Sequence, residues 1–488
     1  MGQSTLTSVS VVYEPDEAEA GETSRFGFFR SVTFQLLAVE GTILAIVLSF
    51  MRILTSEFPT TRAIVRLAVA VGVGIFGFGA LIEAIAAIKR PIPRGHTALN
   101  FPPATAIIPA YLPNEESIIL DTIEQHLRAG PPDLQLIVAY NTPRYLPVEA
   151  DLARMVANEP RLLALKVEQS TSKAANVNAA LGHATGEIIA VFDCDHYPAP
   201  GNYERAWQWL SNGADVVQGR CVIRSPEGAG RPMISKIVAA EFEQMYTVGH
   251  PGRARVLGFG LFGGSNGYWR ADSLRAVKLD PSALTEDIDA SVRLLRSGGR
   301  IVSDPGIVSA ELAPPTMRAL CHQRMRWGQG WFQVTRRHLA SVVTDRQISI
   351  RQRLGAAWVF GFGTLMAWVG ALVLPLSLAG WISHEHTATS PITSALFAFG
   401  TVAFVVQIAV AYRHALPDSR RPSVFASYVI ANIVFYGYLR VALVRLSHLH
   451  ELMGLNRWRV TPRARSESRR GQSPRAVDVA SAVMLDHE

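Results

Sequence analysis

Long apolar stretches dominate both ends of the chain. An apolar stretch of about twenty residues can cross ~30 Å of hydrocarbon as a helix. Two such stretches in tandem favour membrane-spanning helices over buried core helices. The predicted spans are residues 32–51, 67–88, 354–381 and 392–412.

A fifth apolar stretch is harder to place. Residues 424–439 are apolar but shorter, and Arg440 and Arg445 interrupt the continuation. Arginines before the third span, together with the basic tail 448–488, indicate by the positive-inside rule that both regions are cytosolic. Five full crossings would put that tail outside the cell. We therefore expect residues 424–446 to be re-entrant or interfacial.

The remaining boundaries follow from the same pattern. Residues 1–30 lack periodicity and are predicted to be a disordered cytosolic tail, and 31–90 a transmembrane hairpin. Residues 350–447 form the C-terminal transmembrane region. Glu40 and Glu83 fall inside predicted spans, so each is either a functional carboxylate or part of a face packed against protein.

Between the hairpin and the third span, short apolar runs alternate with helical patterns. This alternation is typical of a mostly parallel sheet covered by helices. Two later stretches, 233–246 and 329–339, are amphipathic and lie either in the membrane plane or against the core. The expected strands are 104–110, 134–139, 162–167 and 188–195, and the expected helices are 116–129 and 176–184.

Composition adds two constraints. The chain has a formal charge of +7, and its basic surplus lies beside the apolar stretches. This distribution points to anionic lipid headgroups rather than nucleic acid as the partner. Three scattered cysteines have no zinc-ligand spacing, so they indicate a reducing compartment without a disulfide framework.

The run I-I-A-V-F-D-C-D at 188–195 carries the first candidate chemistry. Ligands of open α/β sheets collect at the carboxyl ends of strands, which is where Asp193 and Asp195 stand. On an extended chain these side chains point to one side, and their mutual repulsion favours a bound divalent cation. The alternative is a solvated aspartate pair at a strand end.

Two further motifs follow in order. T-E-D at 285–287 precedes a predicted helix through 295, where acids in the first turn could simply be capping chemistry. Q-R-M-R-W at 323–327 places Gln323, Arg326 and Trp327 on one helical face. Guanidiniums bind phosphate oxygens and an indole stacks on a sugar, although a basic and aromatic membrane belt is the alternative.

The order of these motifs resembles that of membrane-embedded processive family 2 glycosyltransferases, the group of cellulose, chitin and hyaluronan synthases. The resemblance covers residues 100–340 and implies a cytosolic GT-A-type (Rossmann-like) α/β domain between transmembrane helices. Further matching pieces are I-P-A-Y-L-P-N-E-E at 108–116, S-K-A-A-N-V-N-A-A-L at 172–181, F-D-C-D-H-Y-P-A-P at 192–200, F-G-G-S-N at 262–266, E-L-A-P at 311–314 and W-R-V-T-P-R at 458–463.

The resemblance implies a role for each matching residue. Asp287 would be the catalytic base of an inverting transfer. The donor nucleotide sugar, expected to be a UDP-sugar, would contact Lys173, Asp193, Asp195, Arg324 and Arg326. Asp193 and Asp195 would bind Mg²⁺ or Mn²⁺. The acceptor would contact Trp327, Glu286, Ser265, Asn266 and Gln323.

The chain departs from the family's pattern at one point, and two alternative functions remain open. Where the family has an Asp-Asp-Gly-Ser strand end, this chain has Tyr140 and Asn141, so the nucleotide base must be recognised differently. The resemblance implies a growing β-linked polysaccharide at the plasma membrane, with room for export or accessory subunits. A glycolipid synthase acting on a ceramide- or polyprenyl-type acceptor is the alternative. A non-catalytic transporter or scaffold is disfavoured because all three carboxylates are present.

Overall fold

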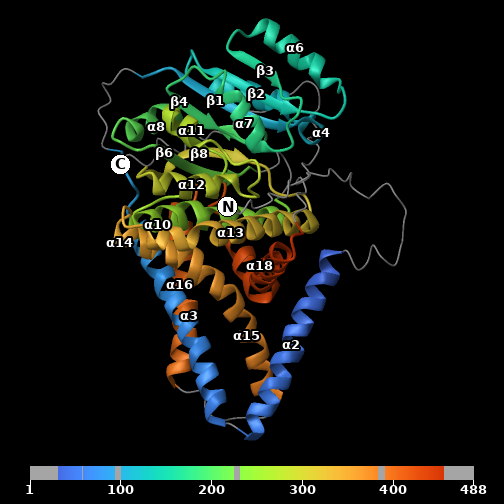
Figure 1. Ribbon diagram of the computed structural model, residues 1–488, viewed down its shortest axis with the longest axis vertical. Coiled ribbons are helices and arrows are strands. Elements are labelled where there is room, and N and C mark those ends of the chain that lie inside the picture. Colours follow the sequence, from blue (N-terminus) through green and yellow to red (C-terminus); the bar gives the residue numbers. More distant parts are fainter. Residues whose placement is uncertain (1–30, 58, 94–100, 225–230, 383–390, 456–488) are drawn as a thin grey trace, which may run out of the picture.

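The computed structural model describes residues 31–57, 59–93, 101–224, 231–382 and 391–455. The predicted tail at 1–30 lies outside them, as does the part of the predicted tail 448–488 that follows residue 455. Three layers are visible in Figure 1. A sheet with its covering helices forms the top, helices that lie crosswise form the middle, and long, steep helices form the bottom.

The top layer contains one eight-stranded sheet with the order β3-β2-β1-β4-β7-β6-β8-β5. β1, β2, β3 and β4 run parallel, as the alternating pattern predicts. The strands are β1 (Ala104–Tyr111), β2 (Gln135–Asn141), β3 (Leu162–Lys166), β4 (Ile188–Val191), β5 (Tyr197–Pro198), β6 (Val216–Ile223), β7 (Gly267–Arg270) and β8 (Ile301–Glu311).

The apolar strands form this sheet because both of its faces are buried. Successive residues of a strand point to opposite faces, and Ile107 and Ile108 accordingly belong to two different core clusters. Helices cover each face, so neither side of β1 meets water. They include α4 (Leu112–Glu115), α5 (Ile119–Ala129), α6 (Val148–Asn158), α7 (Lys173–Leu181), α8 (Asn202–Leu210), α11 (Ala271–Val277) and α12 (Glu286–Arg296).

The second half of the sheet is mixed. β7 runs antiparallel to both β4 and β6, while β6 and β8 are parallel. The sequence pattern did not predict these strands. β6 carries Gln218 and Arg220 in a fully buried run, and such polar residues hide the strand signal.

The crosswise layer contains the two predicted amphipathic helices. α9 (Met233–Gln244) continues through the π-helix η1 (Met245–Gly249) into α10 (His250–Leu257). α13 (Met317–Thr344) is far longer than the expected 329–339. α10 and α13 lie between the sheet and the steep helices (Figure 1); their insertion in the membrane plane stays a prediction.

Five helical segments within the described residues are long and apolar enough to cross a membrane. Four correspond to the predicted spans. The fifth contains α17 and α18 and continues through Leu452, into the predicted tail. They are α2 (Val32–Glu57), α3 (Pro59–Ala87), α14 (Ile350–Ala356) with η2 (Ala357–Phe362) and α15 (Gly363–Ile382), α16 (Pro391–His414), and α17 (Pro422–Ala431) with η3 (Asn432–Tyr436) and α18 (Gly437–Leu452).

Four charged residues of these helices, Glu40, Glu83, Arg440 and Arg445, form ion pairs. Glu40 accepts from Arg445 at 2.6 Å, and Glu83 lies 3.3 Å from Arg253. Both carboxylates therefore lie on faces packed against protein. Arg440 is paired as well, 2.9 Å from Glu241. Because paired arginines are less costly away from water, Arg440 and Arg445 do not by themselves exclude a crossing, and the interfacial placement of 424–446 stays a prediction.

Candidate active site

Lys173 lies at the centre of the candidate site. Ser172 caps the N-terminus of α7 by accepting from the backbone N–H of Ala175, which fixes where Lys173 begins the helix. The Lys173 ammonium lies 2.5 Å from Asp193 and 3.8 Å from Glu286, and it donates to the Gly264 carbonyl at 2.6 Å. Burial lowers the pKa of Lys173, but the Asp193 and Glu286 carboxylates raise it more, so the lysine stays charged.

Asp287 also lies close to Gly264, in the loop that precedes β7. A Cβ atom placed on Gly264 would come within 2.8 Å of the Asp287 carboxylate and 3.4 Å of the Lys173 ammonium. Burial and the neighbouring Glu286 carboxylate raise the pKa of Asp287 to about 7, while Lys173 and Arg326 oppose the shift. A carboxylate with a pKa near the working pH is suited to act as a general base.

This pKa predicts how activity depends on pH. Below about pH 7 the Asp287 carboxyl is protonated and cannot accept a proton, so the transfer rate should rise as the pH increases through about 7. The initial rate of nucleotide release at saturating donor, measured between about pH 5 and 9, tests this expectation. A flat rate, or one that falls across this interval, would contradict the role of Asp287 as base.

Asp193 and Asp195 have different partners and different burial, although we expected both to face one cation. β4 ends at Val191, and the chain then turns, with the His196 N–H donating to the Asp193 carbonyl. Asp193 is partly exposed and faces Lys173. Asp195 is fully buried and accepts from the Leu312 N–H. The extended geometry was wrong because β4 ends at Val191, four residues before the predicted end at 195.

Asp195 has two neighbours that suit a metal. Ligand atoms of Asp195, His196 and Glu311 all lie within 4.8 Å of one another. Burial lowers the pKa of His196, but the Glu311 and Asp195 carboxylates raise it more. Two carboxylates and an imidazole form a donor set that fits a divalent transition ion such as Mn²⁺. Of the predicted metal pair, Asp195 belongs to this group, whereas Asp193 is bound to Lys173.

The Q-R-M-R-W motif lies on α13, as predicted, and α13 contacts the T-E-D motif. A Cβ atom placed on Gly330 would collide with the Thr285 side chain, so the helix packs directly on the start of α12. Arg326 is close enough to lower the pKa of Asp287. The structure therefore brings Asp193, Lys173, Glu286, Asp287 and the α13 helix together.

Arg324 lies in a different environment from Arg326. Its guanidinium is buried, donates to Glu241 at 2.7 Å and stacks 4.2 Å from the Trp327 ring. Gln323 accepts from the same guanidinium at 3.1 Å. Arg324 is thus fixed by its ion pair with Glu241 of α9 and packs against Trp327. The contact of Arg324 with the donor diphosphate stays a prediction, as do the acceptor contacts of Trp327 and Gln323.

Ser265 and Asn266 are placed differently within their loop. Ser265 accepts from the Asp193 N–H at 3.0 Å, which ties it to the site. Asn266 is fully buried at φ +52°, and its amide donates to the carbonyls of Arg220 and Ile307. The acceptor contact predicted for each stays a prediction, although the amide of Asn266 is already engaged by backbone.

The departure at the end of β2 has a structural counterpart. Asn141 donates to the Ser170 carbonyl and accepts from Asn176, so it orders the segment that leads to Lys173. The Tyr140 hydroxyl donates to Glu149 at 3.2 Å. Burial, assisted by Glu149, raises the pKa of Tyr140 to about 12. Neither residue offers the carboxylate that the family carries at this point.

Three residues that the structure places in or beside the site had no predicted role. His196 follows Asp195 directly, and Glu311 opens E-L-A-P, so both stood in quoted motifs. Glu241 had no signal beyond its place on an amphipathic helix. Although burial raises the pKa of Glu241, Arg324 and Arg440 lower it to about 2, so the carboxylate is charged.

Part of the chain matches a family of known enzymes. Residues 102–330 match the family described as "Glycosyltransferase like family 2". The cellulose synthase catalytic subunit [UDP-forming] of Xanthomonas axonopodis pv. citri is 26% identical over 203 residues, which is 39% of this chain and 26% of that protein. Probable glucomannan 4-beta-mannosyltransferase 7 of Oryza sativa subsp. japonica is 24% identical over 59% of this chain and 48% of its own. The chain thus spans from about a quarter to a half of these relatives.

A solved structure supports the fold. The mannosyltransferase PcManGT from Pyrobaculum calidifontis, in complex with GDP-Man and Mn²⁺, matches with a TM-score of 0.52 and 18% identity. The match covers 80% of this chain and 99% of that one. The predicted GT-A-type fold, a mostly parallel sheet flanked by long apolar helices, is confirmed. Residues 102–330 are therefore a glycosyltransferase domain of family 2.

Proposed function

We propose that the protein is an inverting, metal-dependent glycosyltransferase. It moves a sugar from a nucleoside diphosphate donor onto a growing β-linked polysaccharide at the cytosolic face of the plasma membrane. The observation that carries the proposal is the convergence of Asp287, Lys173 and Asp193 on the Gly264 loop. The proposal is also supported by the long apolar helices that flank the domain.

In this mechanism Asp287 accepts the proton of the acceptor hydroxyl while the oxygen attacks the anomeric carbon. Attack comes from the face opposite the diphosphate and inverts the configuration. A positioned base contributes roughly 10²–10⁴-fold to such a step. Arg326 and Lys173 supply positive charge near the departing diphosphate, where charge develops in the transition state. Trp327 provides a flat apolar surface for the acceptor sugar.

A divalent ion fits the donor set of Asp195, His196 and Glu311. Held by these three residues, such an ion would supply Lewis-acid stabilisation of the charge on the leaving diphosphate. Asp193 stays available at the rim of the site, where it orients Lys173. Water must be kept out, since it would compete with the acceptor and hydrolyse the donor.

Purified protein in detergent, incubated with a panel of UDP- and GDP-sugars, tests the proposal through the nucleotide that it releases. The panel includes both nucleotides because the end of β2 lacks the family's base-binding carboxylate. Release of nucleotide that depends on an acceptor, with inverted configuration in the product, is expected. Absence of any release across the panel would contradict the function.

Metal removal should stop this reaction. We expect a chelator such as EDTA to reduce nucleotide release to background, since one side of the diphosphate charge is then unopposed. Added Mn²⁺ should restore the rate at lower concentration than Mg²⁺, because an imidazole in the donor set favours the transition ion. Full activity in EDTA, or restoration by Mg²⁺ alone, would contradict this assignment of ligands.

A glycolipid acceptor is the second candidate. The same carboxylates and α13 motif would serve a single transfer to a ceramide- or polyprenyl-type lipid, which the crosswise helices could bring to the site (Figure 1). Product size separates the two candidates, because a lipid with one sugar and a long polymer migrate very differently. Accumulation of a single-sugar glycolipid alone would favour this second function.

A further inference from the structure

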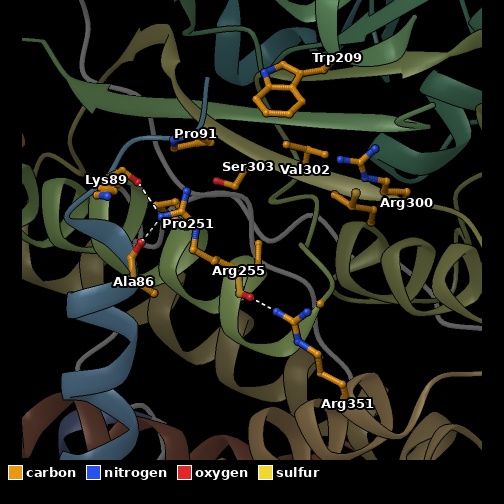
Figure 2. Close-up of a pocket in the computed structure, with 13 residues that line it drawn as sticks. Ala86, Lys89, Pro91, Trp209, Pro251, Arg255, Arg300, Val302, Ser303 and Arg351 are labelled. Atoms are coloured by element: carbon orange, nitrogen blue, oxygen red, sulfur yellow. Dashed lines mark hydrogen bonds between the residues drawn. The ribbon is translucent and has the colours of Figure 1, made fainter. Parts of the chain in front are cut away.

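A cavity of about 280 Å³ lies apart from the residues of the candidate active site. It opens between the end of α3, helix α10, and the first residues of β8 and α14 (Figure 2). Its lining contains four cationic residues and no carboxylate. These four are Lys89, Arg255, Arg300 and Arg351.

Two of the cations donate hydrogen bonds to backbone carbonyls at helix ends, and their positive charge is not neutralised by this. Arg255 donates to the carbonyls of Ala86 and Lys89, at 2.8 and 3.0 Å, and thereby caps the last turn of α3. Arg351 donates to the carbonyls of Val256 and Arg255 at the end of α10. Carbonyl dipoles satisfy N–H groups but do not neutralise a guanidinium.

The other two cations are exposed, and both can reach a ligand. The Arg300 guanidinium donates to the Asn212 carbonyl at 3.2 Å, and Lys89 stands on the opposite side of the cavity (Figure 2). Within the described residues, none of the four cations forms an ion pair with a carboxylate. Arg253 on the same helix shows the contrast, because it is paired with Glu83.

The cavity also has a rigid apolar wall. The Trp209 indole lies over it (Figure 2) and is fixed by a hydrogen bond of 2.7 Å to Asp304, a buried carboxylate that is itself paired with Arg205. Ile301 and Val302 complete this side. A site with several converging cations, one flat wall and this volume suits a small anionic group attached to a less polar body.

The position of the cavity narrows the ligand further. α3 and α14 belong to membrane-length segments, and both reach the layer of crosswise helices beside this cavity (Figure 1). Lys and Arg side chains at the cytosolic surface of a bilayer attract anionic headgroups. Charge-assisted hydrogen bonds from guanidinium and ammonium groups are strongest to phosphate and carboxylate oxygens.

We propose that this cavity binds a phosphate group, carried either by the headgroup of an anionic phospholipid or by a soluble phosphate compound. Lys89 and Arg300 contact the phosphate from opposite sides. Arg255 and Arg351 supply the remaining positive charge while holding α3, α10 and α14 together. Binding therefore joins the end of α3, in the N-terminal hairpin, to α10 and β8, and does not depend on the transfer reaction.

The test compares the full-length protein with the double variant Lys89→Ala/Arg300→Ala. Native mass spectrometry of detergent-solubilised protein, titrated with phosphatidylglycerol or with phosphatidylcholine, measures binding of the lipid. Calorimetry with inorganic phosphate in EDTA measures binding of the soluble anion. The matched control is Arg346→Ala/Arg413→Ala, which removes the same charge from two exposed arginines outside the cavity.

We expect phosphatidylglycerol to bind the parent protein more tightly than phosphatidylcholine does. The double variant should lose roughly tenfold to thirtyfold in affinity for phosphatidylglycerol, and the control should lose little. Binding of inorganic phosphate with the same dependence on Lys89 and Arg300 would identify a soluble ligand; binding of phosphatidylglycerol alone would identify the lipid. Equal affinity in the parent and double variant, an equal loss in the control, or no binding of either probe would overturn the proposal.

The double variant should still fold, because both side chains are exposed and neither caps a helix. Thermal unfolding in detergent and nucleotide release check this for every variant. Should the double variant unfold, Lys89→Ala alone gives the same comparison with a smaller loss. If the parent protein released no nucleotide, the proposed function would be contradicted, but the lipid and phosphate titrations could still be carried out. Failure of the proposed function and failure of the phosphate site are therefore distinguishable.

Discussion

Replacing Asp287 with asparagine should reduce sugar transfer by roughly 10²–10⁴-fold, the usual contribution of a positioned general base. The substitution keeps the shape of the side chain and removes the group that accepts the proton. The Lys173–Asp193 ion pair and the Asp195–His196–Glu311 group do not include Asp287, so donor binding should survive. Nucleotide release and calorimetric binding of the nucleoside diphosphate with Mn²⁺ measure the two quantities separately.

Asp272→Asn is the matched control for this variant. Asp272 lies on α11 with its side chain 96% exposed, so the control removes one negative charge without touching the site. It should retain both transfer and donor binding. An Asp287→Asn protein with normal turnover but weakened donor affinity would assign Asp287 to the donor instead of the acceptor.

Gly264→Ala should also inactivate the enzyme, by roughly 10²-fold, although the new side chain carries no chemistry. Gly264 has φ +89°, and the added methyl carbon would lie 2.8 Å from an Asp287 carboxylate oxygen. That separation is shorter than real contacts allow, so either the carboxylate or the loop must move. Because Lys173 donates to the Gly264 carbonyl, the lysine would move with the loop.

Gly298→Ala separates this effect from backbone strain. Gly298 has φ +82°, but an added Cβ atom would meet nothing within 4 Å. The control therefore carries the same left-handed strain, about 1–2 kcal/mol of stability, without displacing a catalytic group. Transfer rates and thermal unfolding should show lost turnover only in Gly264→Ala and comparable destabilisation in both. Equal turnover in the two variants would show that the loop does not position Asp287.

The first half of the sheet could be predicted because its strands are nearly continuous apolar runs. β1, β2, β3 and β4 appear within a few residues of their expected bounds. β6 was missed because a buried Arg220 and Gln218 interrupt its pattern; Arg220 is held by an ion pair with Glu243 and by the His414 carbonyl. Such pairing depends on residues distant in sequence, so no local pattern announces it.

The candidate site likewise contains residues that the sequence motifs predict and residues that only the fold brings together. Lys173, Asp193 and Asp287 could be named from motifs, and the structure brings them together. The neighbours of Asp195 could not. His196 and Glu311 meet because Tyr197 pairs with Ala310 in the β5–β8 ladder, a contact that requires the fold. The motifs name the chemistry, and the strand pairing completes the donor set.

The buried carboxylate of Glu241 limits how this enzyme can be dissected. It is shared by Arg324 from α13 and by Arg440 and Tyr436 from the last apolar segment, and α17 packs into the same core as α9. Trimming the polypeptide before residue 422 would strip away two of those partners and uncover apolar surface beside the helix that presents Trp327. The catalytic domain is thus not packed independently of the long apolar helices, because a carboxylate of α9 joins α13 to the last of them.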